Sequence, residues 1–367
     1  MNCKLLFIAF FNLSVSHAWA ESTLDARLLL RHGRFIENVD ASSNLIRVDV
    51  TQKKQVGENW DGSIGFKQEL EAIYTTQPDQ YSRDIKKEDT YNFWLKETWL
   101  RYEGQIFSVT AGYQTVVWGE AFGTAYADLV NPKDYRELGL DTLSETRISI
   151  PLVNFQWIWG DSSLQILYLP QAEHHLLPLR GSRYSLLPDN FKVERSSADF
   201  GRNDIGLKGS FRWGTADISL FALQAADRFP VYTVSHVASE IRLRPQFKNL
   251  TSLGATLTAD LSDLLLRAEV IYNLDREMQK GGAFYEETLK TNELIYVLGA
   301  DIVQIKDWEV GLQYSEFRLQ EKENYLFRSD VETSASLRLA RSWDSDISFE
   351  LLYNQHFDKN SHWISPS

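Results

Sequence analysis

The sequence contains only one cysteine, Cys3, among 367 residues. Cys3 lies within the first 20 residues, which we expect to be removed on export, so the mature chain would contain no cysteine. A disulfide scaffold and a cysteine-ligated metal site are therefore excluded. Cys3 also precedes the apolar run near the N-terminus, which is the wrong order for a lipoprotein attachment site.

Long apolar runs are also missing, apart from residues 5–11. A membrane-spanning helix needs about 20 apolar residues, so this run is too short to be one. It follows Lys4 and precedes Ala18-Trp19-Ala20, which is the arrangement of a secretory signal peptide. We expect residues 1–20 to be that signal peptide and residues 21–367 to be a single mature domain.

Positive charge is scarce, because 38 lysines and arginines stand against 50 acidic residues, for a net charge of −12. An acidic chain without a basic stripe is not expected to bind nucleic acid. The sequence has no G-x-S-x-G, H-E-x-x-H or Gly-rich phosphate loop. We therefore expect neither an enzyme nor a cofactor, and we interpret Glu173-His174-His175 as a solvated outer loop rather than a metal site.

Aromatic residues are abundant, at 13% of the chain, although mean hydropathy is only −0.32. They take part in alternating patterns such as Val153, Phe155, Trp157 and Trp159, with polar residues at 154 and 156. Strand side chains alternate between the two faces of a sheet. Aromatic residues near strand ends are typical of the interfacial girdles of membrane barrels. This pattern predicts strands at 24–34, 43–54, 60–75, 91–102, 105–118, 147–159, 163–170, 203–213, 216–225, 249–260, 264–274, 292–304, 308–319, 330–342 and 346–355.

The gaps between these strands alternate between short and long after the second strand. Short turns are expected at 103–104, 160–162, 214–215, 261–263, 306–307 and 343–345. Long polar stretches lie at 76–90, 119–146, 171–202, 226–248, 275–291 and 320–329. Up-and-down barrels have short periplasmic turns, long extracellular loops and an even number of strands. The sequence therefore predicts an all-β transmembrane antiparallel barrel of sixteen strands, the last one incomplete at 362–367, with fourteen strands as the alternative.

One segment stands apart from this alternation. Residues 112–120 read GYQTVVWGE, and residues 127–134 read ADLVNPKD. This segment resembles a poorly characterised proteobacterial family of outer-membrane β-barrels with the signature G-x-Q-x-x-x-W-G-E followed by D-x-x-N-P-x-D. The resemblance covers residues 112–147 and implies an outer-membrane location. It also implies a role in moving hydrophobic or lipid-like molecules.

The loop at 119–146 has 28 residues and many charges, and it is too long to be a mere connector. We expect it to fold into the lumen and constrict it, so that its charged side chains set selectivity. The alternative is that the same residues form salt bridges and turn hydrogen bonds that pin the loop to the wall. The candidate lumen and constriction residues are Gln114, Trp118, Glu120, Asp128, Asn131, Asp134, Arg136, Glu145 and Arg147.

The predicted function is an outer-membrane channel or transporter, for solutes that are either hydrophobic and lipid-like or small and hydrophilic. A non-conducting barrel that acts as a scaffold or partner of an inner-membrane export system is the alternative. An outer-membrane hydrolase, with a site assembled from separate strands and loops, is the least favoured hypothesis. The expected partners are outer-membrane lipid, the barrel-assembly machinery and a small solute.

Overall fold

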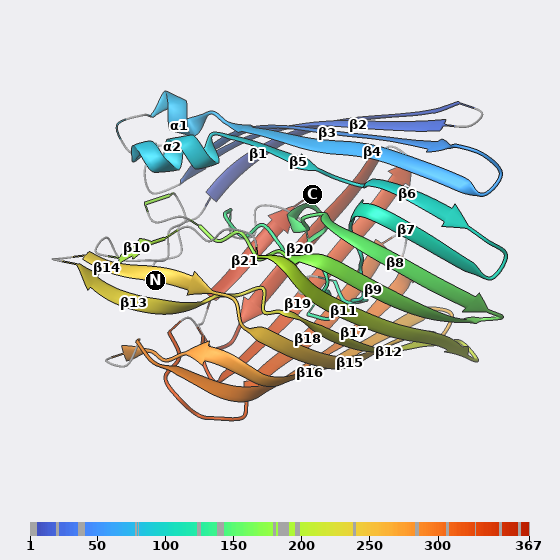
Figure 1. Cartoon of the computed structure of the whole chain (residues 1–367). Coiled ribbons are helices and arrows are strands. Elements are labelled where there is room, and N and C mark those ends of the chain that lie inside the picture. Colours follow the sequence, from blue (N-terminus) through green and yellow to red (C-terminus); the bar gives the residue numbers. More distant parts are fainter. Residues whose placement is uncertain are drawn as a thin grey trace.

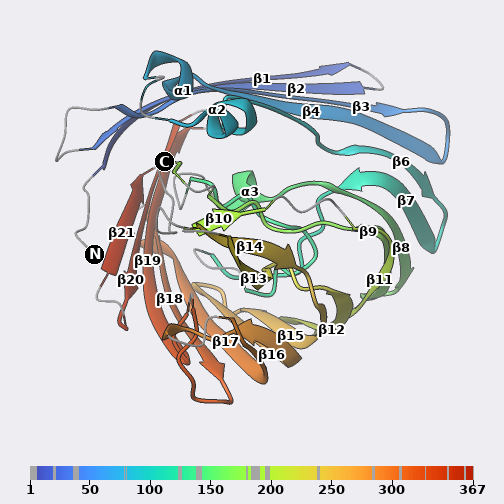
Figure 2. The same ribbon diagram turned by 60° about the vertical axis from the view of Figure 1, so that its left-hand side comes forward.

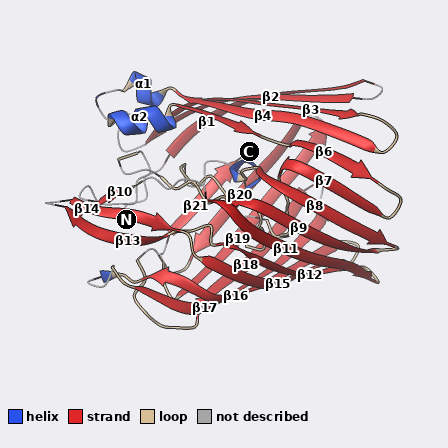
Figure 3. Ribbon diagram, in the orientation of Figure 1, coloured by secondary structure: helices blue, strands red, loops and turns tan. Residues whose placement is uncertain are grey.

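A computed structural model shows a chain made almost entirely of antiparallel β-strands, with three short helices among the described residues (Figures 1 and 3). No described helix is long and apolar enough to cross a membrane. The structure describes residues 6–19, 22–35, 41–77, 79, 81–122, 126–137, 143–178, 181–182, 191–194, 199–237, 240–282, 286–305, 308–326, 328–344, 347–358 and 361–366.

The wall is an up-and-down sheet in which each wall strand except β5 pairs antiparallel with the wall strand that follows it. Two strands, β5 and β6, follow one another along the same edge of β4. The wall strands are β1 (Leu6–Trp19), β2 (Ser22–Phe35), β3 (Ala41–Gln55), β4 (Trp60–Glu71), β5 (Tyr91–Leu95), β6 (Thr98–Glu103), β7 (Phe107–Gln114), β8 (Ile150–Trp159), β9 (Ser162–Ala172), β11 (Asp199–Trp213), β12 (Ala216–Ala226), β15 (Asn249–Asp260), β16 (Leu264–Gln279), β17 (Thr288–Ile305), β18 (Trp308–Leu319), β19 (Val331–Asp344), β20 (Ile347–His356) and β21 (Ser361–Pro366).

All fifteen strands predicted from the sequence are present in this wall, and the stub at 362–367 provides most of β21. The sheet has eighteen strands. Because β5 and β6 share one position, there are seventeen positions, and sixteen without β1, which consists of residues predicted to be a signal peptide. Cleavage after Ala20 remains a prediction. Among the described residues no pairing joins β21 to β1 or β2, so the ring in Figure 2 is not closed.

The two faces of the wall differ as a membrane barrel requires. On β16, Val270 and Tyr272 are 42% and 37% exposed, whereas the alternating residues Glu269, Ile271 and Asn273 are buried. The exposed apolar set therefore faces outward, where a bilayer would cover it, and the buried set faces the interior. Exposed apolar residues continue this outward face on other strands, for example Leu207, Leu220, Leu253, Leu298 and Leu312.

The connections separate to the two ends of the wall. Described tight turns such as 104–106, 160–161, 214–215 and 261–263 lie at one end, and the predicted turn at 306–307 lies outside the described residues. The other end has α1 (Ile73–Thr76), α2 (Arg83–Asp89) and a small sheet of β10 (Phe191–Val193), β13 (Val231–Val237) and β14 (Glu240–Gln246) (Figure 1). We call this second end the loop end. The predicted alternation of short turns and long loops is thus confirmed for the described connections.

The predicted strand at 91–102 is interrupted. Glu97 has a positive φ of 46°, and the Thr98 hydroxyl is hydrogen-bonded to both the N–H and the C=O of Gly65, at 3.0 and 2.9 Å. A Cβ atom at Gly65 would lie 2.2 Å from the carbonyl oxygen of Lys96, so only glycine permits this approach. Other boundaries also differ by three to five residues. The predicted strands 60–75, 105–118 and 147–159 are shorter in the structure, at 60–71, 107–114 and 150–159. The predicted strands 203–213, 264–274 and 292–304 are longer, at 199–213, 264–279 and 288–305.

Candidate functional site

The interior of the barrel contains an apolar core. Its members come from six wall strands, from the segment that follows β7 and from the connection after β18. Inward-facing wall residues include Leu167, Phe221, Ile271 and Phe317, and the following segment adds Val116, Trp118, Ala127 and Val130. The chain between β7 and β8 therefore packs inside the ring of strands, where Figure 2 places α3 (Leu143–Thr146).

The segment after β7 reaches β16, which lies several positions farther around the wall. The carboxylate of Glu269 accepts hydrogen bonds from the backbone N–H groups of Glu120, Ala121 and Ala127, at 2.6, 2.8 and 3.1 Å. Glu269 faces the interior and is 2% exposed, so the contact lies within the barrel. Of the loop predicted at 119–146, residues 123–125 and 138–142 lie outside the described residues.

Asn131 joins the two ends of this segment. Its side-chain oxygen accepts a hydrogen bond from the N–H of Val116 at 2.7 Å, and its amide donates to the carbonyl oxygens of Gln114 and Ile148 at 3.0 and 2.8 Å. Asn131 is fully buried, and all these partners are backbone atoms. Its role is to hold the chain where it leaves β7 beside the chain that enters β8.

Gln114 and Trp118 also make structural contacts. The Gln114 amide donates to the carbonyl oxygens of Thr110 and Leu152, at 3.2 and 3.0 Å. The Trp118 indole N–H donates to Gln165 at 2.8 Å, and its ring packs against Phe221 with a centroid separation of 5.3 Å. Both side chains are buried, so neither is available to a solute.

The charged candidates form two groups of ion pairs. Asp128 pairs with Arg147 at 2.5 Å and lies 3.8 Å from the Lys133 ammonium. Glu145 belongs to the second group, because it pairs with Arg27 on β2 at 2.5 Å and lies 3.9 Å from Arg47, which also pairs with Glu69. Among the candidate residues, Glu120 is the exposed one, so its carboxylate is the one most accessible to water.

Arg136 is the centre of the second group. Its guanidinium makes a bidentate pair with Asp134, with contacts of 2.6 and 2.9 Å. It also lies 3.2 Å from Asp89 at the end of α2, 3.7 Å from Glu69 on β4, and above the ring of Trp94 on β5. These carboxylates raise the pKa of Arg136 above its ordinary value despite its burial.

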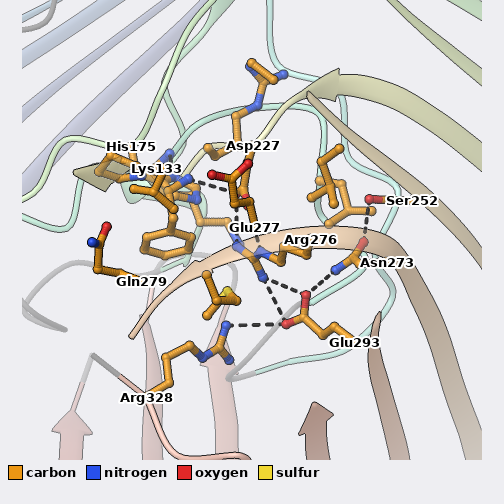
Figure 4. A pocket seen from close by; sticks show the side chains of 18 of the residues that line it. Lys133, His175, Asp227, Ser252, Asn273, Arg276, Glu277, Gln279, Glu293 and Arg328 are labelled. Atoms are coloured by element: carbon orange, nitrogen blue, oxygen red, sulfur yellow. Dashed lines mark hydrogen bonds and ion pairs between the residues drawn. The ribbon is translucent and has the colours of Figure 1, made fainter. Parts of the chain in front are cut away.

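A cavity of about 520 Å³ lies beside this segment, towards the loop end (Figure 4). Most of its lining is apolar, and its volume is in the range of sites for small organic molecules. The apolar lining includes Leu129, Leu223, Phe229, Val231, Met278 and Ile295.

One wall of the cavity is charged. Arg276 on β16 pairs with Asp227 at 2.7 Å and with Glu293 on β17 at 2.7 Å, and Arg328 approaches Glu293 at 3.4 Å (Figure 4). Asn273 donates a further hydrogen bond to Glu293 at 2.5 Å. The Glu293 side chain is fully buried, and its four contacts satisfy its charge. These residues were not among the sequence candidates.

His175 also lines the cavity and was misinterpreted from the sequence. It is packed edge-on against Tyr135 and Phe229, with ring centroids 4.9 and 4.4 Å away. Its Nδ1 accepts a hydrogen bond from the N–H of Lys133 at 2.8 Å. The expectation of a solvated loop at 173–175 is therefore wrong for His175, because a neutral imidazole is amphipathic enough to join an aromatic cluster.

Burial shifts the pKa values of this cluster. The pKa of His175 lies well below 6.5, first because of burial and then because of the cations Lys133, Arg228 and Arg276. The pKa of Lys133 is also lowered by burial, which Asp128 partly offsets. His175 is therefore neutral at neutral pH, which agrees with its role as a hydrogen-bond acceptor.

Three solved outer-membrane proteins share this architecture. OmpT of Vibrio cholerae, folded in vitro, is 10% identical with a TM-score of 0.52, over 99% of this chain and 94% of that chain. OmpF of Salmonella typhi, in a complex with daunomycin, is 7% identical with a TM-score of 0.51, over 95% and 89%. The outer membrane channel DcaP of Acinetobacter baumannii is 9% identical with a TM-score of 0.50, over 98% and 94%. These similarities show an outer-membrane porin fold.

At the level of sequence, residues 39–361 match the profile of a family described as "Protein of unknown function (DUF1302)". No curated protein matches the chain. The matched range includes the whole segment between β7 and β8 and every residue described for the cavity.

Proposed function

The chain belongs to the DUF1302 family, and from its porin fold and its interior cavity we propose that it is an outer-membrane channel or transporter for hydrophobic or lipid-like solutes. The observation that carries the proposal is a mostly apolar cavity of about 520 Å³ inside a membrane-type barrel. A channel for small hydrophilic solutes needs a wet, polar path. An apolar cavity instead favours an apolar solute, because moving apolar surface out of water lowers the free energy.

The loop at 119–146 constricts the lumen in this proposal. Its support is the contact of Glu120, Ala121 and Ala127 with Glu269 on a distant strand, together with the apolar core that the segment completes. The ion pairs of Asp128 and the hydrogen bonds of Asn131 pin the same segment to the wall. The two interpretations of the loop are therefore compatible.

The charges of the cavity favour a neutral solute. The Arg276 guanidinium already faces two carboxylates, and Asp128 already faces Arg147. The buried guanidinium of Arg228 donates to the carbonyl oxygens of Glu173 and Val130, at 2.5 and 2.9 Å. A charged ligand would compete with these contacts, whereas an uncharged apolar ligand needs none of them.

The experiment combines binding and conduction. The purified protein is incubated with a neutral apolar molecule of drug size, with its carboxylate analogue and with its ammonium analogue, and bound ligand is detected by native mass spectrometry. We expect retention of the neutral molecule alone. If a folded barrel retains none of the three molecules, the proposal is contradicted.

The same protein is tested in planar bilayers with and without residues 122–144. We expect small or no conductance steps from the full chain and larger steps after the deletion, because the segment occupies the lumen. Equal conductance for the two proteins would contradict the constriction. As a folding control, both proteins should show the same change in migration on a denaturing gel after heating.

A non-conducting scaffold for an inner-membrane export system is the second candidate. The observation in its favour is that packed apolar side chains fill part of the barrel interior. This function predicts no conductance, no ligand retention, and co-purification with an inner-membrane complex. In both cases outer-membrane lipid and the barrel-assembly machinery are the proposed partners of the wall.

A further inference from the structure

The lining of the cavity is rich in aromatic rings. They come from four separate parts of the chain, namely the segment after β7, the connection after β9, the region from the end of β12 into β13, and the connection after β18. The lining residues with a ring are Tyr126, Tyr135, His175, Phe229, Tyr232 and Tyr325. An apolar solute in this cavity would therefore contact rings as well as aliphatic side chains.

Three of these rings form one cluster around Phe229. The ring of Tyr135 is nearly parallel to that of Phe229, with an interplanar angle of 12° and centroids 6.0 Å apart. The ring of His175 meets Phe229 edge-on, with centroids 4.4 Å apart. Offset-parallel and edge-to-face pairs at about 4.5–7 Å are the favourable arrangements of aromatic rings. The cluster already has the geometry by which one ring recognises another.

Backbone hydrogen bonds fix the positions of these rings. The N–H of Phe229 donates to Asp227 at 3.0 Å, and the N–H of His175 donates to the carbonyl oxygen of Arg228 at 3.1 Å. The N–H of Tyr135 donates to the carbonyl oxygen of Leu176 at 2.8 Å. A site whose side chains are already in place loses little conformational entropy when a ligand binds.

Phe229 differs from the rings of the apolar core in its exposure. Phe221 and Phe317 are 5% and 0% exposed, whereas Phe229 is 40% exposed although it lines the cavity. Its packing against Tyr135 and His175 therefore leaves much of the phenyl surface uncovered. A solute ring has a surface of matching chemistry to lie against.

The cations of the cavity also favour a ring. The Arg276 guanidinium lies 5.8 Å from the ring centroid of Phe229, and that of Arg328 lies 3.4 Å from the centroid of Phe317. The negative face of an aromatic ring attracts such cations, and a saturated ring has no such face. Because the N–H groups of Arg276 bind Asp227 and Glu293, contact with a neutral ring leaves the ion pairs intact.

We propose that the cavity selects aromatic solutes over saturated ones of the same carbon skeleton, and that the solute ring lies against Phe229. This inference rests on the proposed function and narrows its solute class. Burial of apolar surface depends on area, so it gives an aromatic molecule no advantage over its saturated counterpart. A ring pair adds roughly a two- to tenfold gain in affinity beyond burial.

The test compares naphthalene with trans-decalin, its fully saturated counterpart. The purified full chain in detergent is equilibrated with each compound in a sealed vial, and the free compound is measured in the headspace by gas chromatography. Vials with detergent alone give the uptake by micelles, which is subtracted. The measured quantity is the ratio of the two affinities, in which the effect of buried area largely cancels.

We expect naphthalene to bind roughly two- to tenfold more tightly than decalin. The variant F229L should lower this ratio towards one, and F229Y, which keeps the ring, should preserve it. The matched control is F211L, because Phe211 is 41% exposed but does not line the cavity, and the ratio should be unchanged. Heat-dependent migration on a denaturing gel shows that each variant is folded.

The outcomes separate this inference from the proposed function. If the unmodified protein binds both compounds with equal affinity, or binds decalin more tightly, the selectivity for rings is overturned and the proposed function stands. An unchanged ratio in folded F229L would overturn the contact with Phe229. If neither compound binds and the binding assay retains no neutral molecule, the proposed function fails together with this inference.

Discussion

Replacing Glu269 by alanine tests how strongly this side chain fixes the segment after β7 to strand β16. The variant removes the acceptor of three backbone N–H groups, at 2.6, 2.8 and 3.1 Å. A net value of about 1 kcal/mol for each bond gives a loss of about 3 kcal/mol. Because each 1.4 kcal/mol changes an equilibrium tenfold, the segment should open roughly 150 times more often.

Hydrogen exchange measured by mass spectrometry checks this value. Peptides that cover 119–122 and 126–128 should exchange faster by about two orders of magnitude in E269A, whereas peptides from β18–β20 should be unchanged. The matched control is Glu350→Ala, which removes another interior carboxylate that pairs with Arg338 at 3.0 Å and is not bonded to the segment. If exchange is unchanged in E269A, or is accelerated equally in both variants, Glu269 is not the residue that fixes the segment to β16.

Two further predictions concern the cavity. The pKa of buried His175 lies well below its ordinary 6.5, so the folded state favours the neutral ring. The stability that neutral His175 contributes is therefore present above about pH 6.5 and is lost as the pH falls below that value. Thermal unfolding should show this acid loss in the unmodified protein and less of it in H175Q, and an identical pH dependence would contradict it. Arg276→Met removes the guanidinium partner of Asp227 and the nearer of the two guanidinium partners of Glu293, and breaking this buried pair should cost about 3–5 kcal/mol of stability in denaturant unfolding. The exposed pair of Arg212 with Asp217 gives the control R212M, which should cost about 0–1 kcal/mol, and similar losses in both variants would show that the buried network adds nothing.

The wall was predictable because a bilayer imposes one simple rule on its strands. Lipid contacts every second residue, so the alternation at Val153, Phe155 and Trp157 gave a strand that the structure confirms. The interruption at Glu97 was not predictable in this way. It depends on the Thr98 hydroxyl bound to Gly65, a neighbour on another strand, and nothing in the local sequence specifies that contact.

The interior was less predictable, although one signal was present. Residues 294–298 are apolar throughout, and Ile295 and Val297 are buried inside while Leu294 and Leu298 are exposed outside. A continuous apolar run is typical of a strand covered on both faces, and this run marks the interior core. The charged wall of the cavity left no such signal. Arg276 and Asp227 are far apart in sequence and meet only because the segment after β12 folds back towards β16.

In the signature segment, residues 112–147, some contacts lie within the segment and others reach distant elements. The contacts of Asn131 with Val116 and of Asp134 with Arg136 join residues of the segment itself. The partners of Arg136 on α2, β4 and β5 come from earlier parts of the chain. Sequence spacing identified the charged residues of this segment, but their division between cavity and wall required the three-dimensional structure.

Where a strand is apolar on both faces, hydrophobicity cannot fix its pairing register with the neighbouring strand. A shift of the register by one residue would only exchange two equally apolar faces. For β17 that decision falls to a polar ladder across three strands, in which Ser252 donates to Asn273 and Asn273 donates to Glu293, both at 2.5 Å between directly opposed residues. The stagger of neighbouring strands sets the diameter of a barrel. These three side chains therefore help to fix the stagger of β15, β16 and β17, and with it their contribution to the circumference of the barrel.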